Sequence, residues 1–138
     1  MASLQEHLSL KQILRELRIS KEISKQNWQR LRKTFGDRFD KAWKLVTEKR
    51  VKKYLFKPSN RTLWVAIGQN AEYLIYNTAE YCSCNDFYFR VLDHEKAYCY
   101  HLLAQKIAET LNHFDLIQEE DEVYQFLLEI WKEYNVSG

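Results

Sequence analysis

Residues 81–104 read YCSCNDFYFRVLDHEKAYCYHLLA, and their spacing of cysteine and histidine is the most specific pattern in the chain. It holds all three cysteines of the 138-residue chain: Cys82-x-Cys84 is followed, after fourteen residues, by Cys99-x-His101. Three thiolates and one imidazole make a complete tetrahedral shell for Zn²⁺. The spacing therefore predicts one structural zinc ion held by these four side chains.

Three other interpretations of the same residues stay open. The cysteines can be small buried core residues beside an unrelated histidine. Cys82 and Cys84 can form a redox pair, although Cys-x-Cys is not the Cys-x-x-Cys arrangement of thioredoxin-like sites. His94, in the sequence Asp-His-Glu, can replace His101 as the fourth ligand.

The residues before the first cysteine pair predict a small antiparallel sheet. Residues 62–67 (TLWVAI) and 73–76 (YLIY) are rich in strand-forming residues and flank a turn at Gly68, and residues 51–56 form a third strand. The small Ser83 lets the chain turn sharply between the two cysteines. The hairpin leads directly into the metal site.

The residues after the second pair predict a helix over residues 100–112. Cys99 and His101 lie at its start, where the positive end of the helix dipole favours a thiolate. Ala104 follows one turn after His101 on the same face, and a larger side chain there would push the helix away from the metal loop. Strands and helix together make a zinc-clipped ββα unit.

Helices are expected on both sides of this unit. Hydrophobic spacing predicts three short N-terminal helices, up to residue 18, over 21–35 with Gly36 after its end, and over 38–50. A last helix is predicted over 119–134, with the acidic run 119–122 in its first turn. The fold class is thus α+β, with segments 1–50, 51–112 and 113–138 in one compact domain.

The formal net charge of +2 hides a strong asymmetry. Residues 1–63 hold 17 Lys and Arg against 6 Asp and Glu, whereas residues 64–138 hold 4 against 13. The asymmetry indicates either a basic face for a polyanion or attraction between the two halves within one fold. The candidate nucleic-acid contacts are Arg30, Arg32, Lys33, Lys49, Arg50, Lys52 and Lys53, with Trp28, Tyr54 and Phe56 as interleaved aromatic residues.

Several function classes are excluded or disfavoured. The three glycines form no P-loop, nucleophile elbow or dinucleotide motif, and no H-x-E of a zinc deaminase occurs. Four protein ligands would leave zinc no open position for water, so we expect no enzyme activity and no small-molecule substrate. No apolar run is long enough for a membrane helix, and the charged N-terminus is unlike a signal peptide. Three cysteines cannot form a closed disulfide set, which favours a reducing intracellular compartment.

The motif Cys82-Ser-Cys84 … Cys99-Tyr-His101-Leu-Leu-Ala104 resembles the signature C-x-C … C-x-H-x-x-A of the SWIM-type zinc finger. The segment CSCNDF is also similar to the family's run after the first pair, except that Asn85 replaces the usual proline. The resemblance covers roughly residues 51–112. Among SWIM proteins, this chain is most similar to the small stand-alone Shu-type members.

That resemblance implies a partner and a process. Shu-type proteins pair with a RecA-family recombinase paralogue and promote homologous recombination and DNA repair, and some SWIM fingers bind DNA. It also implies the cytoplasm of an archaeon or the nucleus of a eukaryote as location. The alternative is a SWIM module for DNA binding or protein–protein interaction in transcription or mobile-element biology, in which the last helix docks into a partner.

Overall fold

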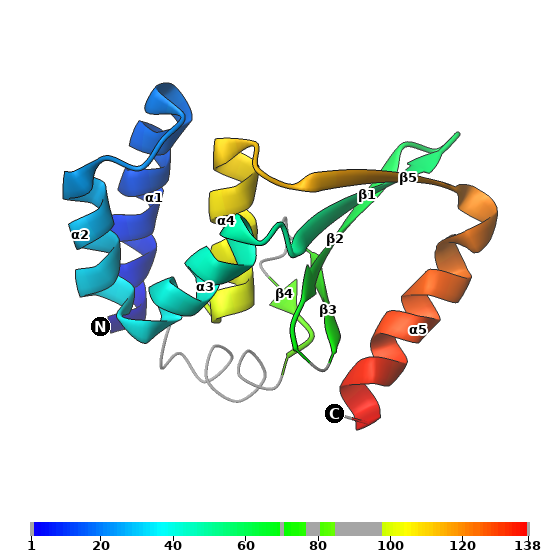
Figure 1. The fold of residues 1–138 in the computed structure, drawn as a ribbon. Coiled ribbons are helices and arrows are strands. Elements are labelled where there is room, and N and C mark those ends of the chain that lie inside the picture. Colours follow the sequence, from blue (N-terminus) through cyan, green and yellow to red (C-terminus); the bar gives the residue numbers. More distant parts are fainter. Residues whose placement is uncertain (1, 70, 77–80, 85–97, 138) are drawn as a thin grey trace.

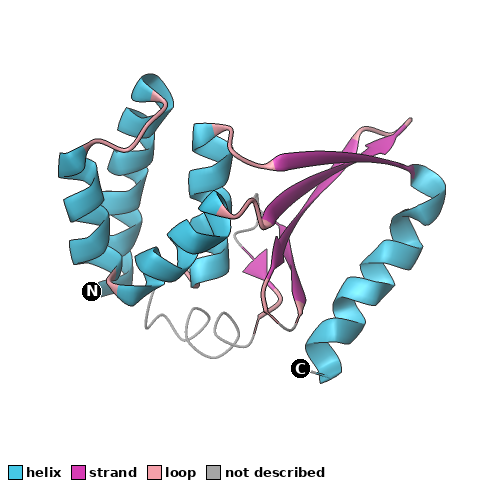
Figure 2. Ribbon diagram, in the orientation of Figure 1, coloured by secondary structure: helices cyan, strands magenta, loops and turns pink. Residues whose placement is uncertain are grey.

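The computed structural model describes residues 2–69, 71–76, 81–84 and 98–137, and within these residues five strands form one mixed sheet. Helices lie against both of its faces (Figure 1). Figure 2 shows the same arrangement, with the N-terminal helices and α4 on one side of the strands and α5 on the other. The observed α+β class confirms the prediction.

Three N-terminal helices and α4 form the layer on one side. They are α1 (Ala2–Ser20), α2 (Lys25–Phe35), α3 (Asp37–Thr47) and α4 (Tyr100–Leu111). Gly36 separates α2 from α3 with a φ of 58°, a left-handed conformation that favours glycine, and its N–H donates to the Arg32 carbonyl at 2.8 Å. Because α4 packs against α1 and α3, the helix that begins at Cys99-x-His101 lies at the centre of this layer.

The strands are β1 (Val51–Lys57), β2 (Arg61–Ile67), β3 (Glu72–Tyr76), β4 (Tyr81–Cys82) and β5 (Asp115–Glu120), in the spatial order β4-β3-β2-β1-β5. Each neighbouring pair of strands from β1 to β4 is antiparallel. This confirms the antiparallel sheet predicted for residues 51–78. The short strand β4 is additional, and it carries Cys82 to the edge of the sheet beside β3.

Alternate side chains of the central strand β2 pack into two separate hydrophobic cores, one on each face of the sheet. Trp64 and Ala66 pack toward α4 and the N-terminal helices, whereas Leu63 and Val65 pack toward α5. Successive side chains of a strand point to opposite faces, so a strand covered on both faces is apolar throughout. This explains why the sequence TLWVAI does not alternate between apolar and polar residues.

The prediction of a helix beginning at residue 119 is wrong. Residues 115–120 form β5, which runs parallel to β1, and a 3₁₀ turn (Asp121–Val123) precedes α5 (Tyr124–Ser137). The free edge of β1 offers main-chain hydrogen bonds to this segment, and Lys52 lies opposite Asp115 and Lys57 opposite Glu120. Glu119 and Glu120 of the acidic run therefore lie in a strand beside β1, whereas Asp121 and Glu122 lie in the 3₁₀ turn that precedes α5.

The apolar face of α5 closes a core. Trp131 is 2% exposed and Leu128 is also buried, and both pack on the sheet face formed by Phe56, Leu63 and Leu74. Helical spacing in the sequence predicts one apolar stripe made of Val123, Phe126, Leu127, Ile130 and Trp131, but Phe126 is 63% exposed. The buried face of α5 is thus rotated from the expected one.

Within the part of the chain that the structure describes, no helix is both long enough and apolar enough to cross a lipid bilayer.

Candidate metal centre

The four predicted ligands come together beside the edge of the sheet. Cys82 ends β4, Cys84 follows two residues later, Cys99 precedes α4, and His101 lies in the first turn of α4. Their sulfur and ring-nitrogen atoms all lie within 4.8 Å of one another, and all four residues are buried. Two chain segments far apart in sequence thus supply two donors each to one point.

Local hydrogen bonds fix both cysteine pairs. The Ser83 backbone N–H donates to the Leu74 carbonyl at 3.0 Å, and the Ser83 hydroxyl accepts from the Leu74 N–H at 2.9 Å. Cys99 is the N-cap of α4, where its Sγ accepts from the Leu102 N–H at 3.5 Å. From the sequence, Ser83 is predicted only to be small enough for a sharp turn between the two cysteines. In the structure its hydroxyl also hydrogen bonds to β3 and so anchors the Cys-x-Cys turn to the sheet.

The cluster fits a tetrahedral metal ion. Bonds of about 2.3 Å to sulfur place tetrahedral donors about 3.8 Å apart, close to the observed grouping. Both nitrogens of the His101 ring are buried, and neither has a hydrogen-bond partner of acceptable geometry. Since buried polar atoms are nearly always satisfied, a metal ion is the natural partner for this imidazole. The four residues can therefore hold one metal ion.

The three sulfur atoms affect each other's ionisation. Burial raises the pKa of the Cys82 thiol and that of the Cys99 thiol well above their ordinary value. Hydrogen bonds from Cys82 and Cys99, with a smaller contribution from the His101 ring, lower the pKa of Cys84. The metal-free cluster thus favours one thiolate held by two thiols, whereas a dication would stabilise three thiolates.

These pKa shifts predict how metal binding depends on pH. At neutral pH the metal-free cluster holds protons on Cys82 and Cys99, and an incoming ion displaces both, so affinity rises with pH and falls by about a hundredfold for each unit of acidification. Loss of the metal is also expected to unfold residues 72–112, and in an unfolded chain all three thiols carry protons at neutral pH. Calorimetry in buffers of different ionisation enthalpy should therefore find between two and three protons released per ion bound, and release of fewer than two would contradict protonated Cys82 and Cys99.

Aromatic residues cover the imidazole on two sides. The rings of Tyr73 and Tyr100 lie with centroids 4.3 and 4.0 Å from that of His101. Ala104 is fully buried one turn further along α4, and its packing beside the metal site stays a prediction. Tyr100 is the chain neighbour of His101, whereas the contact of Tyr73 with His101 depends on the approach of β3 to α4 and could not be predicted from the sequence.

A second set of contacts links the N-terminal helices to the metal loop. Arg38 of α3 donates from Nη1 to the carbonyl of Tyr98 at 2.9 Å, and its guanidinium also pairs with Glu6 of α1. The Tyr98 hydroxyl hydrogen bonds to His7 Nδ1 at 2.6 Å. Tyr98 directly precedes Cys99, so α1 and α3 position a metal ligand.

The geometry of the cluster bears on the three alternative interpretations of these residues. His94 lies outside the described residues, so its contribution stays open. The three cysteines are free and buried, and His101 completes their cluster rather than lying elsewhere in the core. Burial of all three sulfur atoms also disfavours a redox pair at Cys82 and Cys84, because reactive thiols are partly exposed.

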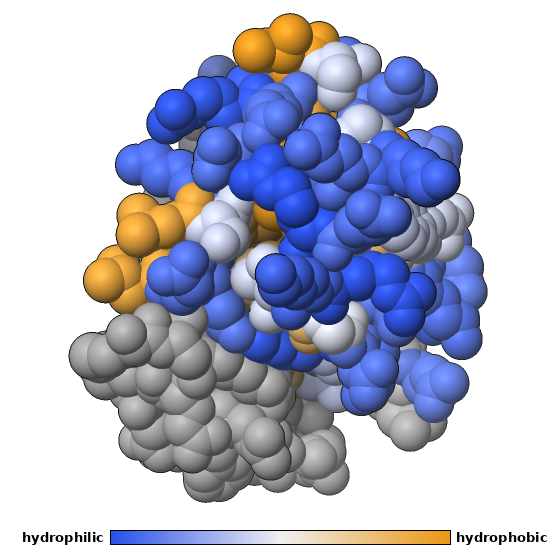
Figure 3. Space-filling view, turned by 90° about the vertical axis from the view of Figure 1, so that its left-hand side faces the viewer, coloured by the Kyte–Doolittle hydropathy of each residue, from blue (hydrophilic) through white to orange (hydrophobic). Residues whose placement is uncertain are grey.

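Most of the candidate nucleic-acid contacts are engaged within the chain. Four of the seven form ion pairs: Arg30 with Glu16, Arg32 with Asp40, Arg50 with Glu48, and Lys52 with Asp115, at 2.9, 3.4, 2.9 and 2.5 Å. Lys53 lies over the Trp64 ring. Figure 3 shows the face formed by α1 and α2, where hydrophilic residues predominate and hydrophobic ones occur in small groups. The role of the seven residues in nucleic-acid binding stays a prediction.

The interleaved aromatic residues are core residues. Phe56 is fully buried against α5, and Tyr54 packs edge-on against Trp131. Trp28 is partly buried between Phe39 and Trp43. The ring of Phe56 is not accessible to a base, so its burial supports the alternative that these aromatic residues belong to the core.

Comparison with known proteins agrees with the motif. No family model matches the chain, and no solved structure does. A protein of Dictyostelium discoideum named Zinc finger SWIM domain-containing protein 7 homolog is 30% identical over 120 residues, which make up 86% of this chain and 77% of that protein. With the buried group of three cysteines and one histidine, this similarity shows that the chain belongs to the SWIM-domain zinc finger family.

Proposed function

We propose that this chain is a non-catalytic SWIM adaptor that uses one structural Zn²⁺ and binds a RecA-family recombinase paralogue, promoting homologous recombination and DNA repair. The observation that carries the proposal is the buried cluster of Cys82, Cys84, Cys99 and His101. Thiolate and imidazole donors in a tetrahedral set are typical of zinc, and the relative's name contains the term zinc finger.

The donor set supports a structural role. A catalytic zinc keeps one position open for water or substrate, whereas four protein donors fill a tetrahedral shell. Three thiolates and one neutral imidazole also leave the centre with a net charge of about −1, which disfavours Lewis-acid chemistry on an anionic substrate. When bound, the ion would join β4 to the start of α4.

The recombinase partner rests on the motif. The signature that ends in Ala104, and the size of the chain, are similar to those of Shu-type SWIM proteins. The buried position of Ala104 on α4 beside the cluster supports that match, because only a small residue leaves α4 close to the metal loop. DNA binding by the basic N-terminal half is part of the same proposal.

Metal analysis together with affinity purification tests the proposal. The purified chain should contain about one zinc per molecule, should not hydrolyse ATP, and should co-purify from its own cells with an ATPase of the RecA family. The variant His101→Gln should lose the zinc, and the matched variant His113→Gln, outside the cluster, should keep it. A zinc-free native protein would contradict the metal assignment, and transcription factors or transposases as partners would support the alternative SWIM role.

A further inference from the structure

A pocket lies immediately beside the metal centre, between α3 and the turn that joins β2 to β3. It has a volume of about 410 Å³ and is lined by Lys41, Lys44, Leu45, Glu48, Arg50, Gly68, Gln69, Tyr73 and Tyr100. Tyr73 and Tyr100 are the two rings that cover His101, so one wall of the pocket is the outer surface of the metal site. A Cβ at Gly68 would lie 3.1 Å from the Tyr73 ring, which explains a glycine at this position.

The cations of the pocket outnumber its single acid. Glu48 pairs with Arg50 at 2.9 Å, and Arg50 also donates to the Gly68 carbonyl at 3.4 Å, so this pair is internally compensated. Lys41 and Lys44 are exposed, and no carboxylate of the described residues forms an ion pair with either. Two positive charges are therefore available to a ligand.

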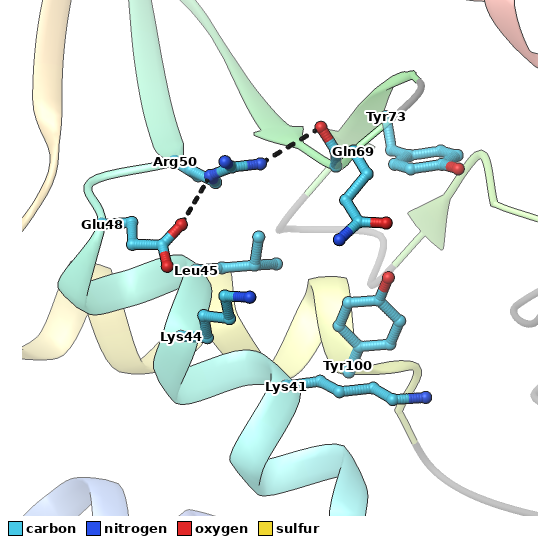
Figure 4. Close-up of a pocket in the computed structure, with 9 residues that line it drawn as sticks. Lys41, Lys44, Leu45, Glu48, Arg50, Gln69, Tyr73 and Tyr100 are labelled. Atoms are coloured by element: carbon cyan, nitrogen blue, oxygen red, sulfur yellow. Dashed lines mark hydrogen bonds and ion pairs between the residues drawn. The ribbon is translucent and has the colours of Figure 1, made fainter.

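The polar groups of the pocket come from three elements: α3, the turn between β2 and β3, and α4. Figure 4 shows the Lys44 ammonium and the Gln69 amide directed into the same space, with the Tyr100 hydroxyl directed toward Tyr73. Lys41 passes along the Tyr100 ring, its Nζ 5.6 Å from the ring centroid. Ammonium, amide and phenol groups are all hydrogen-bond donors, and donors around a net positive charge suit an oxyanion.

We propose that this pocket binds a nucleotide unit of a single-stranded nucleic acid, with its phosphate on Lys41 and Lys44. This inference rests on the proposed function, which assigns DNA binding only to the basic N-terminal half, and it places one contact site in that half. The volume exceeds the needs of a bare phosphate, and Leu45 with the edges of Tyr73 and Tyr100 provides an apolar wall for sugar and base. The amide of Gln69 can donate to and accept from a base edge.

A strand suits the pocket better than a free nucleotide. Sites for free nucleotides hold the charged phosphates with several backbone N–H groups of a glycine-rich loop at a helix start. This pocket offers flexible lysine side chains in place of such a loop, which matches a phosphodiester with a single charge. Lysine contacts of this kind supply affinity without sequence specificity.

Fluorescence anisotropy with a labelled oligothymidylate tests the inference. The double variant Lys41→Gln/Lys44→Gln should bind at least about fivefold more weakly, with the slope of log affinity against log salt reduced by about 1.4, or 0.7 for each lost contact. The single variant Gln69→Glu, in an exposed turn, should weaken binding in the same direction. The control Lys11→Gln/Lys25→Gln removes two exposed lysines from α1 and α2 and should stay within about twofold of wild type.

Each other outcome overturns the inference. Equal losses in both double variants would show charge attraction without a site, and unchanged binding in the pocket variants would exclude the pocket. Stronger competition by a mononucleotide or a phosphopeptide than by the oligonucleotide would assign the pocket to that ligand instead. Zinc content and recombinase co-purification, measured on the same variants, keep failure of this inference separate from failure of the proposed function.

Discussion

Replacing Cys99 by serine is expected to abolish metal binding and to unfold at least residues 72–112. A structural zinc contributes on the order of 10 kcal/mol in finger-type units, which is comparable to the whole stability of an ordinary domain, about 5–15 kcal/mol. The same loss is expected for Cys82→Ser, because either change leaves three donors for four positions. Elemental analysis and urea unfolding of the purified variants measure the two effects.

Serine makes this test specific for the metal. Cys99 caps α4 by accepting from the Leu102 N–H, and serine is itself a good N-cap residue, so the helix start is preserved. Wild-type protein treated with a strong chelator should unfold as readily as the variant does, and the chelator should not destabilise the variant further. A Cys99→Ser protein that retains one equivalent of zinc and the wild-type unfolding midpoint would contradict the assigned shell.

The second large effect is expected for Arg38→Met. Arg38 and Glu6 form a two-pronged ion pair whose side chains are only 19% and 11% exposed, and the same guanidinium holds the Tyr98 carbonyl. Removing one member of a largely buried pair costs about 3–5 kcal/mol, because the other charge stays away from water. The metal affinity should fall as well, since Tyr98 precedes the ligand Cys99.

Two further variants show whether burial is the cause. The double variant Glu6→Gln/Arg38→Met removes both charges and should be more stable than Arg38→Met alone. Arg30→Met breaks the pair of Arg30 with Glu16, which are 32% and 50% exposed, and should cost at most about 1 kcal/mol. Urea unfolding of all three proteins gives the comparison. Equal costs for Arg38→Met and Arg30→Met would show that Arg38 does not connect the helical layer to the metal loop.

Charge asymmetry in the sequence had two interpretations, and the structure supports part of each. Lys52 of the basic half pairs with Asp115 of the acidic half, and Asp121 accepts from the backbone and hydroxyl of Ser59. The other ion pairs of the described residues join partners within the basic half itself. Lys41 and Lys44, which the cluster of basic residues in the sequence did not single out, are the cations beside the pocket.

The C-terminal segment shows why a local pattern predicts a helix at residue 119, where the structure has the end of strand β5. Hydrophobic spacing from Val123 onward is helical, and that part does form α5. The acidic residues before it carry no periodic signal, and their extended conformation depends on the free edge of β1, about sixty residues earlier in the chain. Parallel pairing of β5 with β1 is a long-range contact, and the local sequence pattern of residues 115–120 does not predict it.

The sequence predicted the four metal ligands, the α+β class and the main helices, because ligand spacing and hydrophobic periodicity are local properties of the chain. Tertiary structure alone decided which residues support those ligands. Arg38 and Glu6 are 32 positions apart, and Ser83 hydrogen bonds across to β3. It also placed Tyr73 and Tyr100 around His101 and opened a basic pocket behind them. Contacts of this kind arise when separate elements pack together, and side-chain packing in three dimensions leaves no periodic trace in the sequence.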